Sequence, residues 1–137
     1  MLPKQVFLSH SAKDKQFVSS LAAVLRRHKV PYWYSTSSLE GAQQWHDEIG
    51  KALKNCNWFV LILTPNSVKS EWVKHELMYA LSSKRYKGRI VPLLLKPCNF
   101  AKLSWTLSDF QRIDFTKKKV EGYTELLKIW GIPYTPK

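Results

Sequence analysis

Apolar and polar residues along the chain form two alternating patterns: short continuous apolar runs, and longer stretches in which apolar residues recur every three or four positions. The short runs are typical of strands buried on both faces, and the longer stretches are typical of amphipathic helices. The run at 58–63 contains only apolar residues, so we expect it to be the central strand. Further strands are expected at 4–9, 30–34, 89–95 and 111–115, and helices between 11 and 29 and at 45–55, 70–83 and 120–130.

The order of these elements predicts the fold class. Strands alternate with helices, which indicates a parallel sheet whose crossovers are right-handed. We therefore predict an α/β, doubly wound sheet of five parallel strands with helices on both faces. The length of 137 residues is common for one domain, and no repeat or linker interrupts the pattern, so a single domain over 1–137 is expected.

The charge of the chain is unusual, since 22 Lys and Arg stand against 10 Asp and Glu, giving a formal net charge of +12. This bias favours an anionic partner, and nucleic acid, an acidic protein, an anionic membrane surface and a nucleotide would all fit. No apolar run approaches the roughly 20 residues that cross a bilayer, and no signal peptide is recognisable at the start. Two cysteines are too few for a disulfide scaffold, so a cytoplasmic location is expected.

Two polar segments stand out between these elements. Residues Ser35 to Gln44 are rich in serine and contain Gly41, which predicts an unusually long loop, and such loops are often functional. Residues Ser11 to Asp14 follow the pattern of Ser, two further residues and an acid, which predicts a capped helix start.

Three motifs carry a resemblance over nearly the whole chain. They are FLSHSAKD at 7–14; Trp33 and Tyr34 followed by Leu39, Gly41 and Trp45; and TPNS at 64–67 followed by SEWVKHEL at 70–77. In this order and spacing the motifs resemble those of the TIR (Toll/interleukin receptor) domain family, and bacterial NAD-cleaving TIR domains in particular. The resemblance implies a flavodoxin-like, five-stranded parallel sheet.

The resemblance also implies site residues. Catalytic TIR relatives place an essential glutamate in the third motif, and by matching position this role falls on Glu76. Two departures from the family pattern are Ser35, where many relatives have Asp, and Glu40 before Gly41, where bacterial relatives have Pro. The first of these removes a possible site carboxylate. Substrate contacts are expected from Ser9, His10, Ser11, Leu39, Gly41, Trp45 and Trp72.

The chemistry of NAD cleavage suits this set of residues. Trp72 and Glu76 are four positions apart on one expected helix, so they share a face near the strand ends where ligands bind. Nicotinamide leaves as a neutral molecule, so a single carboxylate can suffice, unlike the pair that ordinary glycosides require. We therefore predict an NAD glycohydrolase, of the NAD nucleosidase or ADP-ribosyl cyclase type. It would release nicotinamide and ADP-ribose or a cyclic isomer, as an immune effector or signal generator.

Structural alternatives exist for each of these residues. Trp72 on an apolar helical face could be a core residue, and Glu76 could form a structural salt bridge with a lysine. Ser9, Ser11 and Asp14 are read mainly as helix-capping residues. His10 lacks the partners of a nucleophilic triad.

The expected partners follow from the same resemblance. NAD is the expected substrate and no further cofactor is expected; no metal is expected either, because the four histidines lack the spacing of a metal site. Other TIR domains are expected partners through self-association, and a membrane is not. Nucleic acid is not expected, although the charge leaves it open. Some TIR members only assemble, so a non-catalytic scaffold acting through homotypic TIR–TIR contacts is the second hypothesis.

Overall fold

Five parallel strands form a single sheet. The computed structural model describes residues 2–34 and 42–136, with the side chains of the second range described from residue 47 onward. The strands lie in the order β2-β1-β3-β4-β5, which confirms the predicted doubly wound sheet with the run at 58–63 at its centre. Their bounds are β1 (Val6–Ser9), β2 (Tyr32–Trp33), β3 (Trp58–Leu63), β4 (Ile90–Leu94) and β5 (Ile113–Asp114).

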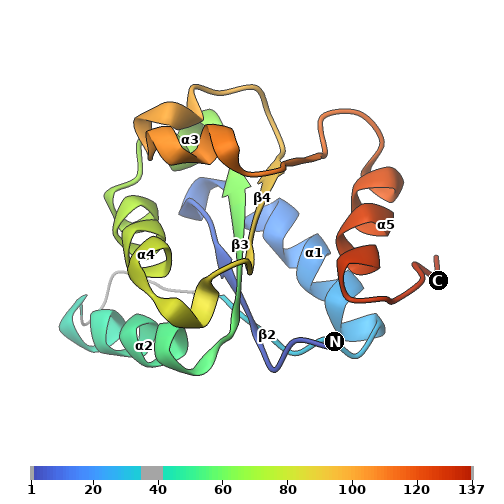
Figure 1. The fold of residues 1–137 in the computed structure, drawn as a ribbon, viewed down its shortest axis with the longest axis horizontal. Helices are drawn as coiled ribbons and strands as arrows, with labels where there is room; N and C mark the ends of the chain where they lie inside the picture. Colours follow the sequence, from blue (N-terminus) through green and yellow to red (C-terminus); the bar gives the residue numbers. More distant parts are fainter. Residues whose placement is uncertain (1, 35–41, 137) are drawn as a thin grey trace.

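Helices cover both faces of the sheet. Figure 1 shows α1 and α5 on one side of the strands, and α2 and α4 on the other. The α-helices are α1 (Lys15–Arg27), α2 (Ala42–Asn55), α3 (Pro65–Val68), α4 (Glu71–Ser82) and α5 (Lys119–Ile129). Short 3-10 helices are η1 (Ala12–Asp14), η2 (Lys84–Tyr86), η3 (Phe100–Lys102) and η4 (Trp105–Asp109).

Alternate strand residues divide the core into two clusters. Leu8 and Ile62 belong to the cluster beneath α1 and α5, whereas Phe7 and Leu61 belong to the cluster beneath α2 and α4. This division follows from the two-residue period of a strand, and burial on both faces explains why β3 contains no polar residue. Ser9 continues the row of Phe7, so its side chain belongs to the α2 and α4 side of the sheet.

The structure corrects two of the expected boundaries. Helix α2 begins at Ala42, so 42–44 are helical rather than part of the loop, since Ala and Gln are good helix formers. Residues 65–67, expected only to break the strand, begin the short helix α3. Thr64 forms a capping box with Ser67, in which Oγ of Thr64 accepts from the Ser67 N–H at 3.1 Å and Oγ of Ser67 accepts from the Thr64 N–H at 2.9 Å.

Strand β5 is shorter than the expected 111–115, and Pro92 explains why. The Phe115 N–H bonds to the Leu94 carbonyl, so even-numbered residues of β4 direct their backbone groups toward β5. Pro92 has the same orientation but no N–H to donate. Pairing therefore begins only at Leu93 with Ile113, and no strand of the described ranges lies beside the first part of β4 on that edge.

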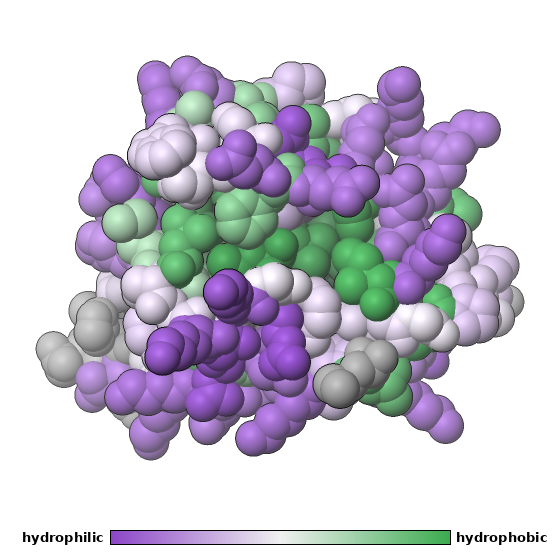
Figure 2. All heavy atoms as spheres, viewed as in Figure 1, coloured by the Kyte–Doolittle hydropathy of each residue, from purple (hydrophilic) through white to green (hydrophobic). Residues whose placement is uncertain are grey.

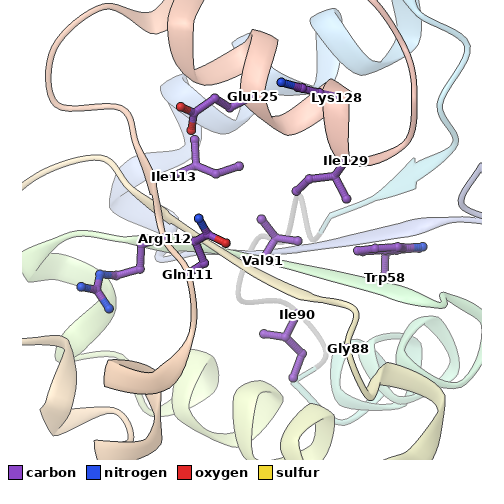
Figure 3. A pocket seen from close by; sticks show the side chains of 10 residues that line it. All are labelled: Trp58, Gly88, Ile90, Val91, Gln111, Arg112, Ile113, Glu125, Lys128 and Ile129. Atoms are coloured by element: carbon purple, nitrogen blue, oxygen red, sulfur yellow. The ribbon is translucent and has the colours of Figure 1, made fainter.

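The open part of β4 borders an apolar hollow. Figure 2 shows hydrophobic atoms gathered across the middle of this face of the molecule, with hydrophilic residues above and below. A hollow of about 490 Å³ lies between α5 and the first half of β4. Figure 3 shows its lining, which includes Trp58, Ile90, Val91 and Ile129 together with the charged residues Arg112, Glu125 and Lys128. Trp58 and Ile90 begin their strands, so the hollow lies away from the carboxyl ends where ligands of such sheets bind.

Candidate active site

The carboxyl ends of β1 and β3 lie side by side where the strand order of the sheet reverses. Ser9, the last residue of β1, is paired with Leu61 of β3, and Thr64 follows the end of β3. Helices from neighbouring strands run to opposite faces at such a point, which leaves a crevice in which ligands of open α/β sheets bind.

Helix α4 places a carboxyl group at this edge. Ser70 caps the helix, because its Oγ accepts a hydrogen bond from the Val73 N–H at 3.2 Å. Glu76 lies in the same buried stripe as Val73 and Leu77, and its side chain is only 7% exposed. A buried carboxyl group needs a partner, and Ser9 Oγ donates a hydrogen bond to Glu76 Oε1 at 2.6 Å.

Burial changes the acidity of this carboxyl group. Loss of solvation raises the pKa of Glu76 to about 7, while the hydrogen bond from Ser9 acts in the opposite direction because it favours the ionised form. The partner of Glu76 is thus a neutral hydroxyl and not the lysine that the salt-bridge alternative required. A buried carboxyl group whose pKa is raised toward neutrality, at the strand ends where ligands of such sheets bind, is typical of a functional site.

Trp72 lies one helical turn before Glu76. Its side chain is half-buried and packs against the cluster beneath α2 and α4, and its ring meets His75 edge-on at 6.4 Å between centroids. Part of the Trp72 ring is therefore a core contact, as the alternative interpretation of this residue required. The rest of the ring reaches the surface one turn of α4 before Glu76.

His10 follows Ser9 directly and is held by the backbone. Its Nδ1 lies 3.2 Å from the Leu8 carbonyl oxygen, and its ring meets the edge of Tyr34 at 5.9 Å between centroids. Burial lowers the pKa of His10. Burial thus favours the uncharged form of this imidazole, and Nδ1 carries the hydrogen of this contact because a carbonyl oxygen can only accept.

The structure corrects the capping role expected of Ser9 and Asp14. Of Ser9, Ser11 and Asp14, only Ser11 caps a helix through its side chain, by accepting from the Lys13 N–H at 3.2 Å. Asp14 makes no capping bond and instead accepts from Thr64 Oγ1 at 2.6 Å and from Asn66 Nδ2 at 3.1 Å. The motif at 64–67 brings a hydroxyl and an amide donor to the buried Asp14 carboxylate. These two donors take the place of the backbone N–H groups at the start of α1 as partners of Asp14.

A family model settles the relationship that the motifs suggested. The model of the TIR domain matches residues 6–127. The chain belongs to the TIR domain family. Its buried Glu76 therefore lies on helix α4 of a TIR fold and is joined to Ser9 at the end of β1.

Curated relatives of this TIR domain cover part of its length. It is 33% identical over 72 residues to the 2' cyclic ADP-D-ribose synthase BtTIR of Bacteroides thetaiotaomicron, covering 52% of this chain and 25% of that protein. It is also 33% identical over 72 residues to the NAD(+) hydrolase TcpC of Escherichia coli, covering 52% and 24%. A third relative, the 2' cyclic ADP-D-ribose synthase AbTIR of Acinetobacter baumannii, is 30% identical over 73 residues, covering 53% and 27%. The matched segment thus spans about a quarter of the length of these relatives.

Solved structures share the fold of this TIR domain. The TIR domain of the Toll-related receptor TRR-2 from Hydra magnipapillata superposes with a TM-score of 0.74 at 19% identity, covering 90% of this chain and 95% of that one. A 2-deoxyribosyltransferase from Bacillus psychrosaccharolyticus superposes with a TM-score of 0.59 at 13% identity, covering 97% and 98%. At these identities the likeness concerns the fold alone.

Not every expected site residue of this TIR domain falls within the described part. Leu39 and Gly41 lie outside the described residues, as does the side chain of Trp45. Their expected contacts with substrate stay predictions. Ser9 and Glu76 are brought into contact, and His10 and Ser11 follow Ser9 at the same edge.

The described residues also bear on metal binding and on membrane insertion. Among the described residues, no three His, Cys, Asp or Glu side chains gather as a metal site would need. None of the helices in the described ranges is both long and apolar enough to cross a bilayer. The two cysteines are free thiols: Cys56 is buried and Cys98 is partly exposed.

Proposed function

We propose that this TIR domain cleaves NAD at the bond between nicotinamide and ribose, with Glu76 as the catalytic carboxylate. The observation that carries the proposal is the buried Glu76 side chain at the crevice of the sheet, bonded to Ser9 and titrating near neutral pH. The names of three relatives, two 2' cyclic ADP-D-ribose synthases and an NAD(+) hydrolase, support the choice of substrate.

Cleavage of the bond between nicotinamide and ribose requires one anionic group beside the ribose. When the C1′–N bond breaks, its electron pair leaves with nicotinamide, which becomes neutral, and positive charge develops on the ribose ring. Ionised Glu76 would accept hydrogen bonds from the ribose hydroxyls and stabilise that positive charge electrostatically. Water, or a hydroxyl of the same ADP-ribose, would form the new C1′–O bond and lose a proton.

Trp72 and Ser9, the two neighbours of Glu76, would have different roles in the reaction. The half-buried Trp72 ring would contact the nicotinamide or ribose face. Ser9 would hold the carboxyl group in position by donating to Oε1 and would favour its ionised form. The released product, either ADP-ribose or a cyclic isomer, would depend on whether water reaches the ribose.

The finer parts of the proposal rest on the family resemblance. They are a cyclic product, a role as immune effector or signal generator in the cytoplasm, and self-association with other TIR domains. If a neighbouring copy completes the site, turnover per subunit should rise with protein concentration. Full specific activity in a dilute, demonstrably monomeric sample would contradict self-association as a requirement.

The experiment that tests the proposal is incubation of the concentrated protein with NAD, followed by chromatography of nicotinamide and of the ADP-ribose products. We expect nicotinamide release from the parent protein and none from Glu76→Gln. Folded protein that releases no nicotinamide at any concentration would favour the non-catalytic scaffold. Release that persists in Glu76→Gln would move the catalytic role to another residue.

A further inference from the structure

A second hollow lies on the opposite side of the sheet from Glu76. It has a volume of about 470 Å³ and is formed by η1 and the first turns of α1, the chain that follows β4, and the start of α5. Figure 1 shows α1 and α5 together on this side of the strands. Its lining residues are Lys13, Asp14, Gln16, Phe17, Ser20, Leu95, Lys96, Lys119 and Tyr123. We call this hollow the α1–α5 groove.

Three lysines from three separate elements line the α1–α5 groove. Lys13 comes from η1, Lys96 follows β4, and Lys119 begins α5. The backbone of Lys96 is fixed to the sheet, since its N–H bonds to the Leu63 carbonyl at 3.3 Å. The Lys119 ammonium group is 3.5 Å from the Phe115 carbonyl oxygen and 6.0 Å from the centre of the Phe17 ring. Neither of these two contacts supplies a negative charge to the ammonium group.

The lining contains one acidic residue, Asp14, which offsets only part of the positive charge of the lysines. Both carboxylate oxygens of Asp14 are engaged, one by Thr64 and the other by Asn66, and the side chain is only 6% exposed. The groove therefore has three positive charges against one inward-bonded negative charge. Like charges that converge on one hollow repel each other, so an anion that binds between them is stabilised.

The other residues that line the groove indicate which chemical groups the anionic ligand carries besides its negative charge. The Phe17 ring is half-buried, and Leu95 and Tyr123 add apolar surface beside it. Ser20 and Gln16 offer a hydroxyl and an amide at the side of α1. A volume of about 470 Å³ lies within the range of pockets that hold small molecules. Phosphate groups beside a ring and a sugar match this combination of charge, aromatic surface and polar groups.

We propose that the α1–α5 groove is a second ligand site of this domain, which binds a nucleoside diphosphate with its phosphates among Lys13, Lys96 and Lys119 and its ring against Phe17. The site is distinct from the proposed NAD-cleaving site, because Ser9 and Glu76 belong to the α2 and α4 side of the sheet. Asp14 and Thr64 join the two regions at the carboxyl ends of the strands. A ligand in the groove would thus contact elements that also border the crevice.

The test uses ADP as the probe, with inorganic pyrophosphate in parallel. Titration is followed calorimetrically and by the backbone amide signals of the protein. We expect ADP to shift the signals of 13, 96 and 119 more than those of Ser9 and Glu76. Lys96→Ala and Lys119→Ala should each weaken ADP binding about threefold to tenfold, since each removes one partly screened charge contact.

Matched controls separate a built site from general attraction to a basic protein. Lys118 adjoins Lys119 but does not line the groove, so Lys118→Ala should change ADP binding by less than about twofold. An equal loss in Lys118→Ala and Lys119→Ala would overturn the proposal, as would ADP shifts centred on Ser9 and Glu76. Pyrophosphate should bind more weakly than ADP; equal affinity would refute the ring contact.

A further variant keeps the two proposals distinguishable. Glu76→Gln should lose NAD cleavage and keep ADP binding in the groove. If NAD cleavage is absent from the parent protein while ADP still binds with the expected lysine dependence, the proposed function fails and the second site stands. If ADP binding disappears in Glu76→Gln, the groove is not a separate site.

Discussion

Ser9 and Glu76 are separated by 67 positions in the sequence, and their side chains meet at 2.6 Å at the carboxyl end of β1. The contact joins β1, next to the central strand, to α4, which places the carboxyl group in the buried stripe of that helix. Among the described residues Ser9 is the hydrogen-bond donor to Glu76, and burial raises the pKa of the carboxyl group to about 7. The predicted behaviour of the site follows from this pair.

Glu76→Gln is expected to abolish nicotinamide release, lowering the rate by a factor of about a hundred or more, because the neutral amide cannot stabilise the positive ribose of the transition state. Chromatography of nicotinamide measures the effect. The amide can still accept the hydrogen bond from Ser9, so the variant should remain folded. Glu71→Gln, one turn and a half earlier on the exposed side of α4, is the control and should keep the parent rate.

The stability of the parent protein should fall relative to Glu76→Gln as the pH rises from about 4.5 to about 7. Below this window Glu76 is protonated in both the folded and the unfolded chain. Within it the unfolded chain releases the proton while the folded chain retains it, because the folded pKa is raised to about 7. Above pH 7 the difference reaches roughly 3 kcal/mol at most. Urea unfolding of both proteins at pH 4.5 and pH 8 would show it, and a constant difference would contradict the raised pKa.

Ser9→Ala should move the pH dependence of NAD cleavage to higher pH. The ionised form of Glu76 is the active one, so kcat/KM is expected to rise with a midpoint near pH 7 in the parent protein. Removing the Ser9 hydroxyl removes the group that favours ionisation, which raises the pKa further. Ser82→Ala, at the exposed end of the same helix, should leave the midpoint in place. A lower rate in Ser9→Ala without a shift of the midpoint would count against this role of Ser9.

Asp14→Ala should destabilise the fold by about 2–3 kcal/mol, because it leaves Thr64 Oγ1 and Asn66 Nδ2 without their charged acceptor at a buried position. Urea unfolding measures the change in the free energy of unfolding. The matched variant Asp109→Ala removes an exposed carboxylate and should change stability by less than about 0.5 kcal/mol. Equal effects of the two substitutions would argue against the Asp14 network.

Two glycine substitutions should act in opposite directions. A Cβ at Gly122 would lie 2.6 Å from the ring of Phe115, so Gly122→Ala should destabilise the packing of α5 by about 1–3 kcal/mol. A Cβ at Gly50 would meet nothing within 4 Å, so Gly50→Ala in α2 should stabilise the protein by up to about 1 kcal/mol through helix propensity. Thermal unfolding of both variants checks the pair, and a stabilising Gly122→Ala would show that α5 packs differently.

The fold was predictable because its strands are buried on both faces. The run at 58–63 coincides with β3, and Ser70 and Ser83 bound α4 as expected. The cross-strand contacts were not predictable: no local pattern shows that Asp14 turns toward Thr64 instead of capping α1, or that Pro92 delays β5. Glu76 was identified by its motif, but its partner Ser9 became visible only when the strand and the helix were placed together. The single domain over 1–137 and the roles of the site residues remain predictions.

The short β5 also bears on how molecules of this protein meet one another. Ile90 and Pro92 direct their backbone groups to an edge that no strand covers in the described part of the chain. Such an edge is a template on which a strand of another molecule can add, and it is a common starting point of aggregation. Pro92 removes one donor from the template, and the charged residues that line the adjoining hollow are of both signs, with Glu125 beside Lys128 on α5. A strand that added there would meet an interrupted row of hydrogen-bonding groups, so Pro92 makes this edge a poorer template for copies of the same chain.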